Sequence, residues 1–154
     1  MNKQLKKTVI HNTIIRIQKI KKKQKRMKSY IIINSDKLTT QQIRSFIITQ
    51  PHIVVNNGDE KKYSSNTYGY NSCEFDFPSD DGTIENSLYY IKLFIKENAA
   101  SIEKMRILDC DLDISLKLVI ELDENTLPDT YFDNEIVGLL SIIKSDIDID
   151  LYHK

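Results

Sequence analysis

Carboxylates at every second position are the residues of this sequence whose spacing most clearly indicates a chemistry. They occur in three segments, "CEFDF" (73–77), "DCDLD" (109–113) and "DIDID" (146–150). Side chains two apart on a β-strand point the same way and lie about 6.8 Å apart, so they do not converge as the oxygen ligands of a metal ion must. Such rows are suited to attract a basic partner. The carboxylates expected to bind this partner are Glu74, Asp76, Asp109, Asp111, Asp113, Asp146, Asp148 and Asp150.

Residues for catalysis or metal binding do not form a recognised pattern. The histidines His11, His52 and His153 are scattered, and no zinc-binding spacing, phosphate-binding loop or nucleophile elbow is present. The cysteines Cys73 and Cys110 both lie in alternating apolar runs, which predicts two buried and unreactive thiols. We therefore expect a protein that is not an enzyme and that uses no metal or cofactor.

A second candidate surface is the polar segment 57–72, which begins "NGDEKKYSSNTYG". Its tyrosines Tyr63, Tyr68 and Tyr70 lie among Asn, Ser and Gly, a composition suited to adaptable recognition. Two plainer interpretations remain open. Long polar loops are often only mobile connections, and Tyr70 can equally begin the next strand.

The zero net charge of the chain hides a strong asymmetry. Residues 1–28 contain eleven Lys and Arg and no acid, whereas the other 11 of the 22 basic residues face all 22 acidic residues, which leaves residues 29–154 at −11. We therefore divide the chain into a basic arm (1–28) and a single acidic domain (29–154). The arm is too polar around Arg16 for a secretion signal. It is either an appendage upstream of Met27 or a contact for nucleic acid or an anionic membrane through "KIKKKQKR".

Hydrophobic spacing predicts five strands and three helices within the acidic domain. The first helix begins at a Thr39 cap with Gln42 three residues later, and the second begins after Thr83 and ends near Asn98, with a further turn or two at 101–105. The third helix is expected around 132–143 after an opening at Pro128–Thr130. The strands are expected at 29–34, 52–56, 73–77, 108–122 and 146–151.

The order β-α-β-β-α-β followed by α-β indicates a ferredoxin-like βαββαβ core with a C-terminal αβ unit. Because the apolar residues alternate along the strands, we expect an α+β two-layer sandwich with helices on one face of a mainly antiparallel sheet. Ile147, Ile149 and Leu151 would then be buried under the helices, and the alternating acids would face away from them. A plainer role for those acids is to aid solubility and discourage edge pairing.

Two motifs of this chain resemble a bacterial family called domain of unknown function 4279. The first, "PHIVVNNGDEKKYSSNTYGY", contains Pro51, Gly58-Asp59 and Gly69-Tyr70, and the second is the terminal "DIDIDLY". The resemblance spans residues 27–152 and leaves the basic arm outside. Tyr70-Asn71 stands where the family often has an aromatic residue followed by Trp, and this chain contains no Trp. The resemblance implies no agreed activity, although small acidic domains of this sort are found beside bacterial toxins as immunity proteins.

These observations together predict a cytoplasmic, non-enzymatic interaction protein. No run approaches the 18 apolar residues of a transmembrane helix. The leading hypothesis is an immunity-type inhibitor that binds a basic partner, such as a bacterial toxin, through the acidic sheet face or the polar loop. One alternative is a regulatory module that binds a small ligand, which rests on analogy between folds alone. The other is binding of nucleic acid or an anionic surface through the basic arm.

Overall fold

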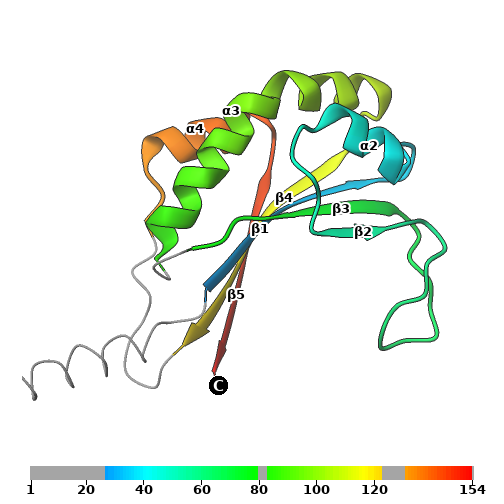
Figure 1. Cartoon of the computed structure of the whole chain (residues 1–154), viewed down its shortest axis with the longest axis horizontal. Coiled ribbons are helices and arrows are strands. Elements are labelled where there is room, and N and C mark those ends of the chain that lie inside the picture. The colour runs from blue at the N-terminus through cyan, green and yellow to red at the C-terminus, as the bar shows by residue number, and fades with distance from the viewer. Residues whose placement is uncertain (1–26, 80–82, 123–130, 154) are drawn as a thin grey trace, which may run out of the picture.

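The computed structural model describes residues 27–79, 83–122 and 131–153, and the expectation for a helix opening at 128–130 lies outside them. The described chain contains five strands and three helices (Figure 1). In chain order they are β1 (Met27–Ser35), α2 (Thr40–Phe46), β2 (Ile53–Val55), β3 (Asn71–Asp76), α3 (Ile84–Leu108), β4 (Asp113–Leu122), α4 (Asn134–Ile142) and β5 (Asp146–His153).

The five strands form one open sheet in the order β2-β3-β1-β4-β5. The pairs β2·β3, β1·β3 and β1·β4 are antiparallel and β4·β5 is parallel, so the sheet is mixed. The three helices lie on the same side of this sheet, above the strands in Figure 1. The predicted α+β class with helices on one face is therefore confirmed.

The hydrophobic core lies between the helices and one face of the sheet. Alternate residues of the central strands are buried there, and Leu116 and Leu118 of β4 are completely inaccessible to solvent. The Phe94 ring of α3 packs against Phe75 and Phe77, with ring centroids 5.1 and 5.3 Å apart. This burial of alternate strand residues confirms the two-residue period on which the sheet prediction depended.

The first two predicted helix starts are confirmed by their caps. Thr39 and Gln42 form a capping box, in which the Thr39 side chain accepts from the Gln42 backbone and the Gln42 side chain accepts from the Thr39 backbone. Thr83 caps α3 by accepting from the Asn86 backbone. The third helix starts at a different cap, Asp133, whose side chain accepts from the Ile136 backbone at 2.8 Å.

The predicted strand 108–122 was wrong over its first residues. The helix α3 does not end near Asn98 but continues for 25 residues to Leu108, and β4 begins only at Asp113. Asp109 is the C-cap of α3, and Cys110 lies exposed in the turn that follows. The expectation that both thiols are buried is therefore correct for Cys73 alone.

The first strand begins inside the segment that we assigned to the basic arm. β1 starts at Met27, and Lys28 is paired with Val119 of β4. Lys28 therefore belongs to the sheet, whereas residues 1–26 lie outside the described part of the chain. The charge of the sheet face must be counted with this lysine included.

Candidate functional site

The face of the sheet turned away from the helices is the candidate functional site, and we call it the open face. Its members follow from the strand register, because residues opposite each other on paired strands share a face. Tyr30 of β1, for example, is opposite Asp76 of β3 and Lys117 of β4, and Lys117 is opposite Asp148 of β5. The charged residues at open-face positions are Glu74, Asp76, Asp113, Glu121, Asp146, Asp148, Asp150, Lys28 and Lys117.

The charge of the open face is strongly unbalanced, since these strand positions hold seven carboxylates and two lysines. Lys117 is the central cation, with its Nζ 2.9 Å from Asp150 Oδ2 and 3.4 Å from Asp148 Oδ2. These hydrogen bonds, the one to Asp150 first, raise the pKa of Lys117 and keep it charged. One ammonium group cannot balance the whole row, so a net negative field remains across the sheet.

Tyr30 marks the middle of the open face, and our reading of the sequence did not identify it. Partial burial raises the pKa of the Tyr30 phenol first, and the negative charges of Asp76 and Glu74 raise it further. The phenol therefore stays protonated and can donate a hydrogen bond among carboxylates. A period of two counted from the buried Ile31 and Ile33 would have placed Tyr30 on this face.

Glu74 is an open-face carboxylate whose ionisation lowers the stability of the fold, mainly because the carboxyl is partly buried. Partial burial raises the pKa of this carboxyl; His52 opposes the effect and the charge of Asp76 adds to it. A carboxyl whose pKa is higher in the folded than in the unfolded protein is destabilising when ionised. That cost is absent below the unfolded pKa of about 4.3 and complete above the folded pKa.

We therefore expect Glu74→Gln to make the protein more stable at pH 7, and the gain should shrink as pH falls toward 4.5. Urea unfolding at several pH values measures this difference. Glu97→Gln is a matched control, because Glu97 is exposed on α3, away from the open face. A loss of stability in the Glu74 variant at pH 7 would mean that this carboxylate has a favourable partner and that its charge carries no cost.

The last strand carries its acids on the open face, as predicted, but its apolar residues are less buried than expected. Asp146 and Asp148 are opposite Ser115 and Lys117, and Ile147 and Ile149 are opposite the buried Leu116 and Leu118. Nevertheless Ile147 is 45% exposed, Ile149 41% and Leu151 53%. The expectation that these three are buried was wrong, because β5 is the edge of the sheet.

Two of the predicted binding carboxylates do not belong to the open face. The Asp109 side chain is only 1% exposed and accepts a hydrogen bond from Ser35 Oγ at 2.5 Å. Asp111 is exposed in the turn before β4, where its Oδ2 lies 3.4 Å from Lys37 Nζ. Both predictions failed because the strand starts later than the alternation indicated. The remaining six, which are Glu74, Asp76, Asp113, Asp146, Asp148 and Asp150, share the open face.

The polar loop between β2 and β3 is held by its own backbone. Two backbone hydrogen bonds join the two ends of the loop. Gly58 N donates to Tyr68 O at 2.8 Å, and Tyr68 N donates to Asp59 O at 2.9 Å. Gly58 has a φ of +92°, which favours glycine at this turn. The structure brings Tyr68 and Tyr70 together, with ring centroids 5.8 Å apart, and leaves Tyr63 90% exposed. Tyr68 and Tyr70 thus pack against each other, whereas Tyr63 is almost fully open to solvent.

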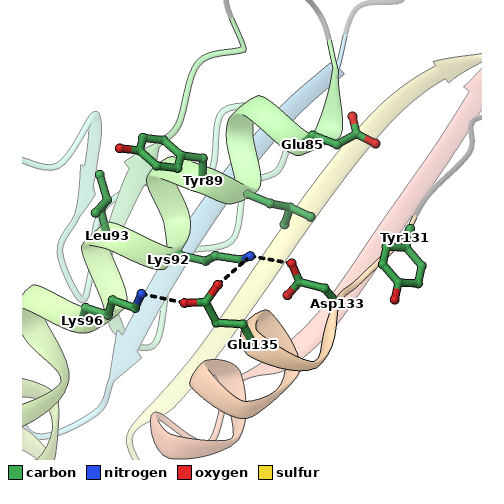
Figure 2. A pocket seen from close by; sticks show the side chains of 9 residues that line it. Glu85, Tyr89, Lys92, Leu93, Lys96, Tyr131, Asp133 and Glu135 are labelled. Atoms are coloured by element: carbon green, nitrogen blue, oxygen red, sulfur yellow. Dashed lines mark hydrogen bonds and ion pairs between the residues drawn. The ribbon is translucent and has the colours of Figure 1, made fainter.

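A groove of about 350 Å³ lies between α3 and the start of α4 (Figure 2). Lys92 Nζ contacts Asp133 at 2.5 Å and Glu135 at 3.0 Å, and Lys96 Nζ contacts Glu135 at 2.6 Å. Hydrogen bonds to Asp133 and Glu135 raise the pKa of Lys92. Because both lysines are paired with Glu135 of α4 or with its N-cap Asp133, these ion pairs join the two helices across the groove.

A metal site and a membrane-spanning helix are both absent from the residues that the structure describes. Within residues 27–79, 83–122 and 131–153, no three His, Cys, Asp or Glu side chains come together as a metal site would require. Among the helices in those ranges, none is both long and apolar enough to cross a membrane. Burial raises the pKa of the Cys73 thiol to about 11, so this cysteine is a poor nucleophile.

Comparisons with known proteins place the chain in a family without assigning it an activity. No curated protein and no solved structure matches it. Residues 25–154 match a family described as "Domain of unknown function (DUF4279)". This match covers every described element, from β1 to β5, and begins two residues before β1. The chain therefore belongs to the DUF4279 family.

Proposed function

We propose that this protein is a non-enzymatic interaction protein whose open face binds a basic protein partner, in the manner of an immunity protein that inhibits a bacterial toxin. The observation that carries the proposal is the excess of seven carboxylates over two lysines on one uncovered sheet face. Such a face speeds the encounter with a positively charged surface. Nuclease-type toxins have such surfaces because they bind phosphate.

The arrangement of the open face favours a macromolecular partner over a small ligand. Its charges are spread along four strands of an open sheet and are not gathered in a pocket. Small-molecule sites are concave and mostly apolar, with a few convergent polar groups. Nucleic acid is disfavoured on this face because its phosphates would be repelled by the carboxylates.

The strand order suggests how the acidic open face is built up from two parts of the chain. We interpret the first six elements as a ferredoxin-like unit, because the order β2-β3-β1-β4 with antiparallel pairs is the order that a split βαβ arrangement requires. The α4–β5 unit then adds one parallel strand beyond β4. On this interpretation, the added strand widens the acidic surface by the row Asp146, Asp148 and Asp150.

The test is binding to a basic protein, with the product of the gene beside the one for this chain as the first candidate. Calorimetry would compare the intact chain with a variant that removes three open-face charges, Glu74→Gln, Asp76→Asn and Asp148→Asn. We expect a loss of affinity of about tenfold or more, since each charge contributes to complementarity with the partner. A partner whose toxicity is relieved by the intact chain should also be relieved less by the variant.

A matched variant with the same change in net charge is available outside the open-face positions. Asp36→Asn, Glu97→Gln and Glu103→Gln remove three exposed carboxylates from the loop after β1 and from α3. This control should bind almost as tightly as the intact chain. Equal losses in the two variants would show that only net charge matters, and an open-face variant with full affinity would reject the open face as the binding surface.

A further inference from the structure

The strand β5 has one edge that no other described strand covers. It lies at the end of the sheet and pairs only with β4 over eight residues. The opposite edge is formed by β2, which has three residues. An edge strand directs part of its backbone N–H and C=O groups outward, and a long exposed edge is a template for another strand. The described part of the fold therefore contains one long edge suited to strand addition.

The side chains of β5 differ sharply between its two faces. Asp146, Asp148 and Asp150 lie on the open face, and the residues between them lie on the helix side. On the helix side, Ile149 is 41% exposed although Leu118, directly opposite it on β4, is completely buried. The helical layer thus ends at this strand and leaves an apolar row that a neighbour could cover.

A second copy of this chain is a poor occupant of the β5 edge. Antiparallel pairing of β5 with itself would bring aspartates of the two copies against one another on the open face. Like charges directly opposite each other destabilise a pair of strands. The neighbouring Lys117 already lies between Asp148 and Asp150 of its own chain. The charge pattern therefore favours a strand that brings positive charge.

We propose that β5 accepts a sixth strand from a protein partner, an extended segment in which basic and apolar residues alternate. Its backbone would pair with the free edge of β5. Its basic side chains would lie beside the aspartates, and its apolar side chains would cover Ile147, Ile149 and Leu151. This inference rests on the proposed function and specifies how the basic partner is recognised.

The experiment uses the intact chain and a capped eight-residue peptide in which lysine and valine alternate. Two controls have the same charge: a peptide with the lysines and valines in separate blocks, and the alternating peptide with N-methylated amides. We expect the alternating peptide to bind at least about tenfold more tightly than either control. Amide hydrogen exchange should slow in residues 146–153 when it binds.

The outcomes separate this inference from the proposed function. Equal binding of the alternating and block peptides, without protection of β5, would overturn strand addition but leave an electrostatic open face. Binding of none of the three peptides would contradict both. Slow amide hydrogen exchange in β5 without any peptide would also overturn the inference, because the edge would already be paired. If the protein is then a concentration-dependent dimer, a second copy fills the edge. If it is a monomer, another segment of this chain fills it.

Discussion

Replacing Asp109 with alanine should lower the free energy of unfolding by about 2–4 kcal/mol, because a buried hydrogen-bonded carboxylate would be lost. Its side chain accepts from Ser35 Oγ at 2.5 Å and from the Asp111 backbone at 3.1 Å. Ser35 Oγ in turn accepts from the Leu38 backbone at 2.7 Å. One carboxylate therefore fastens the end of β1 to the turn between α3 and β4, and urea unfolding at pH 7 measures its contribution.

The control for this prediction is Asp111→Ala, two residues away. The Asp111 side chain is 79% exposed and its ion-pair partner Lys37 is exposed as well, so its loss should change stability little. Although burial alone raises the pKa of Asp109, the hydrogen bonds from Ser35 and Asp111 and the charge of Lys37 together lower it. Similar effects of the two substitutions would contradict a structural role for Asp109.

The lowered pKa of Asp109 also fixes the direction of the pH dependence. A carboxyl whose pKa is lower in the folded than in the unfolded protein stabilises the fold above its unfolded value of about 3.9. This stabilisation disappears as pH falls through the folded pKa. The difference between the intact chain and the Asp109→Ala variant should therefore be smaller in acid than at pH 7.

Leu118→Ala should destabilise the fold by about 2–5 kcal/mol, the usual cost of truncating a fully buried leucine. Ile149→Ala is the matched change on β5, because these two residues are opposite each other in the β4·β5 ladder. Ile149 is 41% exposed and Leu118 is completely buried, so the Ile149 variant should lose roughly half as much or less. Thermal and urea unfolding of both variants test this difference.

Equal losses in the two variants would have a clear meaning. They would show that β5 is covered on its helix side as deeply as β4. The apolar row that the added strand is expected to cover would then already be covered in the isolated protein. This comparison thus tests a premise of the further inference without requiring any partner.

Local signals in the sequence were sufficient for most of the elements. The capping box at Thr39 and Gln42, and the cap at Thr83, depend on contacts within a few residues and were therefore readable. The alternation in β4 and β5 determined which residues share a face, because a strand has a strict period of two. Six of the eight predicted carboxylates reached the open face for this reason.

The sequence predictions failed where the structure depends on residues that are distant along the chain. Leu108, Cys110 and Leu112 continue the two-residue period of β4, but Leu108 also continues the apolar spacing of Ile102 and Met105 in α3. Asp109 looked outward-facing in the sequence, whereas its partner Ser35 is 74 residues away. No local pattern reveals such a pair.

The exposure of β5 was equally hidden from the sequence. Alternation shows that Ile147, Ile149 and Leu151 share a side, but burial also requires that a helix cover them. That requirement depends on strand order, and the order places β5 at the edge. The open face also gained Lys28, since β1 begins earlier than expected, and Tyr30, which the period of two along β1 places there.

The most direct test of the central claim is the rate of association with the basic partner at low and high salt. The variant Asp146→Asn, Asp148→Asn and Asp150→Asn removes the β5 charges and leaves its apolar residues in place. We expect this variant to associate more slowly than the intact chain at low salt and to show a flatter salt dependence, because salt screens the charges that steer the encounter. The matched variant of Asp36, Glu97 and Glu103 should keep the steeper dependence of the intact chain. An Asn variant that associates at the rate of the intact chain, with the same dependence on salt, would contradict the assignment of the open face as the interaction surface.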